Sequence, residues 1–163
     1  MHKIDISRFV CIGGILISLA VLFQAAPVYL PTVGLILSPL STLPVAIAAV
    51  INISLGLTVL FGSALILAVI SFQETLILIF TTGLLGMVMG SFIYRKGIIK
   101  AILFSSIALY IGMLFLTYIL GFAVFVELTK LLSTLLINLA FFLFSLIYST
   151  IWNVCFRKLM NRI

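Results

Sequence analysis

The stretch GLLGMVMGSFIYRKGIIK, residues 83–100, decides how this chain folds, because it joins a run of small and apolar residues to a basic cluster. The basic residues are Arg95, Lys96 and Lys100, and no other such cluster lies away from the two ends. In membrane proteins Lys and Arg gather in the loops on the cytoplasmic side. The cluster therefore predicts the side of a membrane on which this part of the chain lies, and other segments follow by counting spans from it.

The composition is that of a membrane protein. Of the 163 residues, 65% are hydrophobic and only 7% are charged, whereas soluble domains are about half apolar and about a quarter charged. The apolar residues come in runs of roughly 20, the length that crosses a bilayer as a helix. The net charge of +6 comes from residues at the ends of these runs, which favours contact with lipid headgroups and excludes a nucleic-acid partner.

We expect one polytopic membrane domain, residues 1–163, with six helical spans. The expected spans are residues 9–29, 32–52, 55–72, 75–94, 101–121 and 131–156. The second is interrupted by Pro39 and Pro44, and because proline removes a backbone donor, we expect residues 28–42 to be partly irregular. Irregular backbone at membrane depth requires protein or a water-filled cavity around it.

The distribution of charge supports this span count. With six spans and a cytoplasmic N-terminus, every one of the 9 basic residues except Lys130 lies inside, as the positive-inside rule favours. A single helix over residues 42–72 would be about 46 Å long, too long to cross once without a large tilt, and would move the central basic cluster outside. The predicted fold is all-α and membrane-integral, with both termini cytoplasmic.

Two small-residue faces predict close helix packing. Gly83, Gly86 and Gly90 share one helix face, and Gly14 and Ser18 form a similar pair in the first span. Helices in lipid associate through such faces, because small residues let the backbones approach. Each face serves either packing within the chain or an interface with a partner subunit, and the sequence leaves both alternatives open.

A polar stripe predicts a binding site near the outer surface. Glu127, Lys130, Thr134 and Asn138 recur every three or four residues, and Asn138 would lie about 12 Å deeper than the first two. A polar residue at this depth is costly unless it faces a partner or a cavity. The alternative is a surface pair of Glu127 and Lys130, with Asn138 bonded to a neighbouring helix.

Other polar residues are expected at the same outer face. We expect them to converge on one mouth, with Tyr118 and Phe142 as aromatic walls; they are Gln24, Tyr29, Gln73, Glu74 and Thr75. The candidate substrate-binding residues are therefore Glu74, Glu127, Lys130, Thr134 and Asn138, which would orient a solute in a mostly apolar cavity.

The residues that catalysis requires are missing from the pattern. The single histidine is His2, and no cluster of His, Cys or carboxylate has metal-ligand spacing. The sequence also has no glycine-rich phosphate loop and no serine with a base partner. We therefore expect neither an enzyme nor a metal or other cofactor.

In length, hydropathy and basic-inside topology, the chain resembles the substrate-capture (S) component of energy-coupling factor transporters, prokaryotic importers of vitamins and micronutrients. The likeness includes a Pro-bearing first connection that leads into Leu43-Pro44-Val45. Family members dock on their coupling subunit through an Ala-x-x-x-Ala pattern in the first helix, and Gly14 and Ser18 occupy the matching positions. A Gly-Pro-x-x-Gly-like turn of the family is replaced here by residues 52–56, Asn-Ile-Ser-Leu-Gly.

The resemblance implies a function that depends on partners. Such a component binds a small vitamin-like solute from the outer side of the prokaryotic plasma membrane, and a membrane coupling subunit with a pair of ATPases drives its release. The main alternative is a non-transport protein that assembles with another membrane protein through the small-residue faces. A channel-like homo-oligomer would need a continuous polar face through a span, and none is found in the sequence.

Overall fold

The computed structural model describes residues 6–93, 95, 97–121 and 134–161. Within these ranges all regular secondary structure is helical, and the helices group into six spans that are long and apolar enough to cross a membrane. The spans are Ile6–Tyr29, Pro31–Ile51, Ile53–Ile70, Phe72–Ile93, Ile98–Ile119 and Leu135–Met160. The prediction of an all-α, six-span membrane protein is confirmed.

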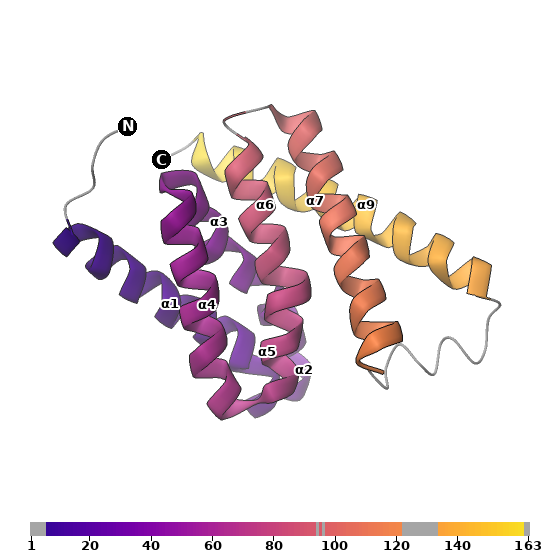
Figure 1. Ribbon diagram of the computed structural model, residues 1–163, viewed down its shortest axis with the longest axis horizontal. Helices are drawn as coiled ribbons and strands as arrows, with labels where there is room; N and C mark the ends of the chain where they lie inside the picture. Colours follow the sequence, from indigo (N-terminus) through magenta and orange to yellow (C-terminus); the bar gives the residue numbers. More distant parts are fainter. Residues whose placement is uncertain (1–5, 94, 96, 122–133, 162–163) are drawn as a thin grey trace.

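Three of the spans are built from more than one helical element (Figure 1). In chain order the elements are α1 (Ile6–Tyr29), α2 (Pro31–Leu37), the 3₁₀ turn η1 (Ser38–Ser41), α3 (Thr42–Ile51), α4 (Ile53–Ile70), α5 (Phe72–Ile77), the π-helical turn η2 (Leu78–Thr82), α6 (Gly83–Ile93), α7 (Ile98–Leu114), the π-helical turn η3 (Phe115–Ile119) and α9 (Thr134–Met160).

The partial irregularity that was predicted for residues 28–42 is present at two places. The backbone is helical apart from Leu30, whose φ of −132° and ψ of 79° separate α1 from α2, and it tightens into a 3₁₀ turn over Ser38–Ser41. Pro31 occupies the first position of α2 and Pro44 lies in the first turn of α3. At the first position of α2, which follows the non-helical Leu30, the N–H has no intrahelical acceptor, so Pro31 removes little there.

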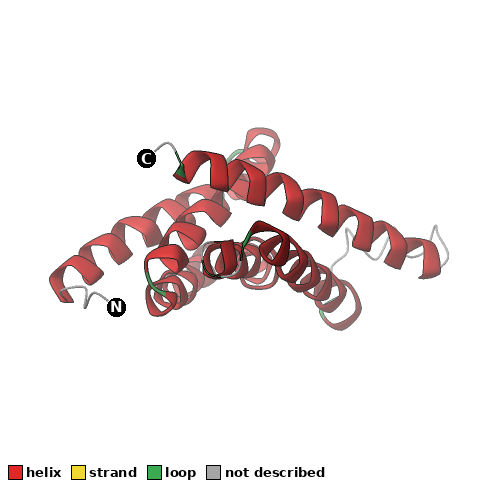
Figure 2. Ribbon diagram, turned by 90° about the horizontal axis from the view of Figure 1, so that it is seen from above, coloured by secondary structure: helices red, strands yellow, loops and turns green. Residues whose placement is uncertain are grey.

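The helices pack against one another in successive pairs, and α4, α6 and α7 form the near face in Figure 1. The contacts run from α4 to α3, from α3 to α6, from α6 to α7 and from α7 to α9. The first and last helices lie obliquely at the outside, with α9 crossing behind α6 and α7 in Figure 1 and along one side of the bundle in Figure 2. Buried apolar side chains such as Leu55, Leu67, Leu85 and Met89 fill the space between these helices.

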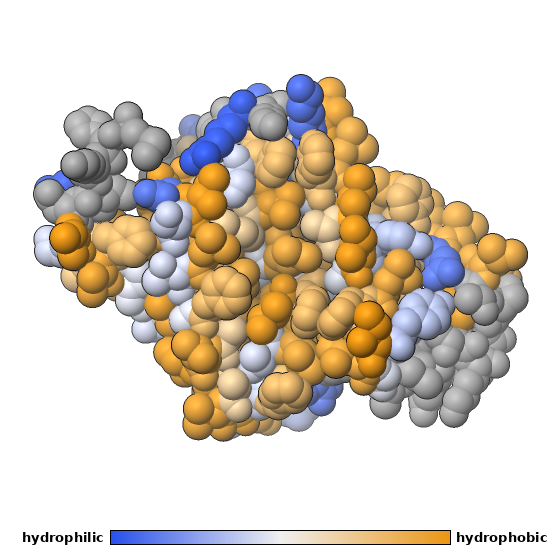
Figure 3. Space-filling model, viewed as in Figure 1, coloured by the Kyte–Doolittle hydropathy of each residue, from blue (hydrophilic) through white to orange (hydrophobic). Residues whose placement is uncertain are grey.

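The outer surface is as apolar as the interior. The face seen in Figure 3 is covered mostly by hydrophobic side chains, and Leu65 and Val69 on α4 are almost fully exposed. Lipid tails solvate such side chains as well as a protein core does, so no force buries them. This surface fits a bilayer and would be insoluble in water.

Two basic side chains at the end of α9, Arg157 and Lys158, lie beside the start of α7 at one end of the bundle. A shallow groove is lined by Ile98 at the start of α7 and by Arg157, Lys158 and Asn161 at the end of α9. The start of α5 lies at the opposite end of the fourth span (Figure 1). The span count predicts this separation, and the assignment of the basic end to the cytoplasm stays a prediction.

Candidate functional site

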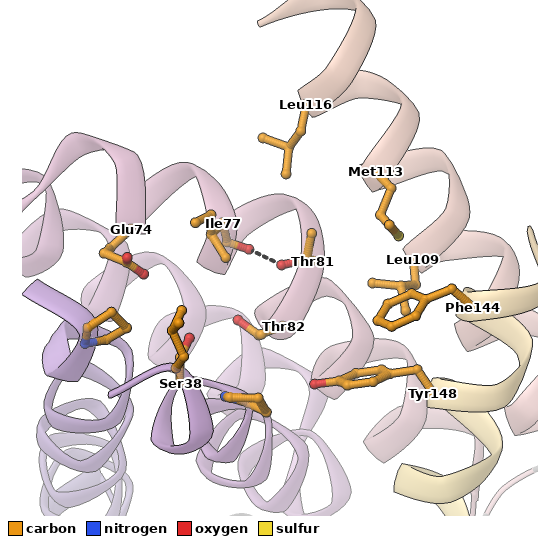
Figure 4. A pocket seen from close by; sticks show the side chains of 13 residues that line it. Ser38, Glu74, Ile77, Thr81, Thr82, Leu109, Met113, Leu116, Phe144 and Tyr148 are labelled. Atoms are coloured by element: carbon orange, nitrogen blue, oxygen red, sulfur yellow. Dashed lines mark hydrogen bonds between the residues drawn. The ribbon is translucent and has the colours of Figure 1, made fainter. Parts of the chain in front are cut away.

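A cavity of about 360 Å³ lies between η1, the fourth span, the fifth span and α9 (Figure 4). Its wall is mostly apolar, with a few hydroxyl groups and one carboxyl group. The lining residues are Pro27, Leu35, Ser38, Pro39, Glu74, Ile77, Thr81, Thr82, Leu109, Met113, Leu116, Phe144 and Tyr148. Few polar groups in a concave apolar wall are the usual composition of a small-molecule site.

The two π-helical turns shape this cavity. In η2 the consecutive residues Thr81 and Thr82 both line the cavity. In η3 the same kind of turn carries Leu116, which lies above Met113 and Leu109 in Figure 4. Single π turns inside helices occur frequently at functional sites.

Gln24 organises a buried polar network beside the cavity. It is 0% exposed, and its amide Nε2 donates a 2.8 Å hydrogen bond to Oε2 of Glu74. Its carbonyl Oε1 accepts hydrogen bonds from the hydroxyls of Ser41 at 2.7 Å and of Thr82 at 3.0 Å. The network joins α1, η1, α5 and η2, so four elements that form the cavity wall are held in register.

The Glu74 carboxyl group bonds to the described residues through one of its two oxygens. The residue is 8% exposed, and Figure 4 shows its carboxyl group directed into the cavity. Its backbone N–H is capped by Ser71 Oγ at 3.4 Å. Within the part of the chain that the structure describes, Oε1 of Glu74 accepts no hydrogen bond and the carboxyl group has no ion pair.

Aromatic side chains from α9 form the opposite wall. The rings of Phe144 and Tyr148 stack with their centroids 5.5 Å apart, and Tyr148 points across the cavity towards Thr82 in Figure 4. The predicted walls, Tyr118 and Phe142, do not line the cavity. Phe142 instead meets Tyr110 edge to face, with a centroid separation of 5.8 Å.

Of the five predicted substrate-binding residues, the structure brings Glu74 to the cavity. Asn138 is half-buried and its Oδ1 accepts a long hydrogen bond from Tyr118 Oη, at 3.4 Å, the neighbouring-helix bond that was the alternative. Thr134 is the first residue of α9. Glu127 and Lys130 lie outside the described residues.

The glycine face of the fourth span packs within the chain. A Cβ at Gly86 would lie 2.6 Å from the Thr42 carbonyl oxygen, and one at Gly90 would overlap the Ala46 carbonyl oxygen, both on α3. A Cβ at Gly83 would overlap a Leu60 methyl group of α4. The face therefore provides close contact of α6 with α3 and α4.

The small-residue pair of the first span faces outward. Gly14 and Ser18 are exposed, and a Cβ at Gly14 would meet nothing within 4 Å. The Ser18 hydroxyl donates to the Gly14 carbonyl oxygen at 2.9 Å, so its hydrogen bond is satisfied within the helix. This leaves a smooth strip on α1 onto which another helix could pack closely.

A second buried polar cluster joins α7 to α9. Asn153 Nδ2 donates to Ser105 Oγ at 3.0 Å and to the Ser149 carbonyl oxygen at 2.8 Å. Ser105 and Ser149 share a hydrogen bond of 2.6 Å between their hydroxyls. Sequence reasoning did not identify this cluster, although an amide within a long apolar run was the available signal. Gln24 is also an amide at the end of an apolar run. It was predicted to lie at the outer face, but its hydrogen-bond partners were not predicted.

No protein family, curated protein or solved structure matches this chain.

Proposed function

We propose that this chain is the solute-capture subunit of an ATP-driven importer of the energy-coupling factor type. In this role it binds a small vitamin-like or micronutrient solute from the outer side of a prokaryotic plasma membrane. The observation that carries the proposal is the apolar, aromatic cavity of about 360 Å³ with the Glu74 carboxyl group in its wall. This volume is at the lower end of the roughly 300–1,000 Å³ that is usual for ligand sites.

The position of the cavity along the spans supports capture from one side. Glu74 is the third residue of the span Phe72–Ile93, so it lies near a membrane boundary, and Thr82 lies about 12 Å deeper at the helical rise. The basic residues Arg157 and Lys158 are at the other end of the bundle. If the basic end is cytoplasmic, the cavity belongs to the outer half of the membrane.

The surface of α1 supports the need for a partner. The exposed strip of Gly14 and Ser18 would let a helix of a membrane coupling subunit approach the α1 backbone. The ATPase pair would then act through that subunit.

The same strip favours a second candidate function. A membrane assembly protein would use Gly14 and Ser18 to bind another membrane protein and would need no solute. The two candidates differ in what the strip binds, and this can be measured directly.

The test is purification of the tagged chain from its native membrane in mild detergent, with bound proteins identified by mass spectrometry. We expect a larger membrane subunit and two ATPases with nucleotide-binding motifs to co-purify. Gly14→Leu should lower their recovery about tenfold or more, because it fills the strip. Thr58→Leu, an exposed substitution on α4, should leave recovery unchanged.

Recovery of the chain alone, or with a membrane complex that has no ATPase, would overturn the importer proposal. A complex without ATPases that is lost in Gly14→Leu would support the assembly protein instead.

A further inference from the structure

We propose that the solute is a compact organic cation, an ammonium-type group joined to an apolar body, and that Glu74 binds the cationic group. This inference rests on the proposed function, because it names the class of solute that the same cavity would take. It is carried by the way the network around Gln24 orients the polar groups of the cavity wall.

The orientation of the Gln24 amide is fixed by its partners. An ionised carboxylate can only accept, so the amide nitrogen faces Glu74, and the carbonyl oxygen accepts from the hydroxyls of Ser41 and Thr82. A flipped amide would turn its N–H groups towards the two hydroxyls and its oxygen towards a carboxylate oxygen, losing the bond to Glu74. Gln24 therefore acts as a donor that holds one oxygen of Glu74.

The remaining oxygen of Glu74 is an acceptor directed at the cavity. Among the described residues Oε1 has no hydrogen-bond partner, while the lining hydroxyl of Thr81 donates to the Ile77 carbonyl oxygen (Figure 4). A solute with N–H donors can reach a free carboxylate oxygen, and ammonium donors form the stronger, charge-assisted bonds with it.

The charge of the wall favours a cation over an anion. Among the residues that the structure describes, the lining contains one carboxyl group and no Lys, Arg or His, and a carboxylate without a counter-charge in an apolar site is costly. A bound cation would offset that cost, whereas an anionic solute would meet a like charge and no basic group from the described part of the wall.

The aromatic wall fits the same chemistry. Phe144 and Tyr148 stack on α9, across the cavity from Glu74, and aromatic ring faces attract cations as well as apolar groups. Leu109, Met113 and Leu116 complete an apolar lining. The body of the solute would therefore be apolar or aromatic and small, since the cavity is only about 360 Å³.

A competing interpretation is that Glu74 is protonated and donates to a neutral solute that carries an acceptor. Glu74→Gln separates the two, because glutamine keeps an N–H donor for such a solute and an oxygen that can accept from Gln24. The substitution therefore removes only the negative charge of the side chain.

The experiment uses the purified full-length chain in detergent and three probes of nearly equal shape: phenethylamine, 2-phenylethanol and 3-phenylpropionate. Binding is followed by thermal stabilisation and by the fluorescence of Trp152, the single tryptophan, whose ring centroid is 6.2 Å from that of Tyr148. We expect the amine to bind about 10- to 100-fold tighter than the alcohol and the anion, in keeping with a charge-assisted hydrogen bond.

In Glu74→Gln the preference for the amine should disappear. The matched control is Gln73→Glu combined with Glu74→Gln, which restores the net charge at the adjacent, exposed position but outside the cavity. This double variant should bind like the single one.

The inference is overturned if the alcohol or the anion binds as tightly as the amine, if none of the probes binds at millimolar concentration, or if Glu74→Gln retains the preference. The probe comparison in the unaltered protein decides the question even if a variant does not fold. If the ATPase partners co-purify but any of these results is found, the proposal of a cationic solute is refuted and the importer proposal stands.

Discussion

The side chains of Gln24 and Glu74, 50 residues apart in the chain, meet at 2.8 Å in the interior of the bundle. Both side chains are buried, and Gln24 is 0% exposed. Their hydrogen bond connects the first span to the start of the fourth. Hydrogen bonds of this kind are a main source of specificity in lipid, where apolar contacts are available on every side of a helix. The pair thus fixes the geometry of the cavity wall.

Replacement of Gln24 by leucine should destabilise the protein strongly. It leaves the Ser41 and Thr82 hydroxyls and the Glu74 carboxyl group without their buried partner, and we expect a loss of about 2–4 kcal/mol in the free energy of unfolding. Unfolding in detergent micelles by heat or denaturant measures it. Gln73→Leu, at an exposed site, should change the stability by less than about 0.5 kcal/mol. Equal stabilities for the two variants would contradict the network.

Alanine at Gly90 should be costly and alanine at Gly14 should not. At Gly90 the added methyl overlaps the Ala46 carbonyl oxygen of α3, so we expect a loss of about 1–3 kcal/mol. At Gly14 nothing lies within 4 Å, and alanine should be neutral or stabilise the helix by up to about 1 kcal/mol. Paired melting curves compare the two, and a stable Gly90→Ala would mean that α6 and α3 are further apart than described.

Asn153→Leu should weaken the contact between α7 and α9. The substitution removes hydrogen bonds to Ser105 and to the Ser149 carbonyl oxygen, but it also removes Asn153 Oδ1, which is buried without a partner among the described residues. The two effects oppose each other, so the expected loss is only about 1 kcal/mol, near the values for polar contacts between membrane helices. Thr150→Leu, on the exposed side of α9, is the control. A gain in stability for Asn153→Leu would show that the cluster is a net cost.

Cysteine labelling should reveal the orientation in the membrane. In a chain with Cys11→Ser and Cys155→Ser, which removes the 2 cysteines, single cysteines are placed at the exposed positions Gln73, Arg95 and Arg157. An impermeant thiol reagent should label position 73 in intact cells, and positions 95 and 157 only after permeabilisation. Labelling of position 95 from outside would refute the basic-inside orientation, and opposite sides for positions 95 and 157 would refute the span count.

The sequence by itself determined the number of spans. Apolar runs of membrane length have one stable outcome, since every backbone N–H and C=O in lipid must be bonded within a helix. Even the proline-marked segment 28–42 followed this rule and became helical, because its prolines fall where helices begin. The position of Glu74 near the end of a span and the small-residue faces could also be predicted, as polarity and side-chain size are properties of single residues.

Tertiary structure alone decided which faces meet. Lipid solvates apolar side chains as well as the core does, so the periodicity of a span says little about its inward face. The aromatic wall therefore came from Phe144 and Tyr148, where Tyr118 and Phe142 were predicted. The pairing of Gln24 with Glu74 and the buried contacts of Asn153 likewise depend on how distant helices pack, because a polar group in lipid takes the partner that the bundle brings within reach.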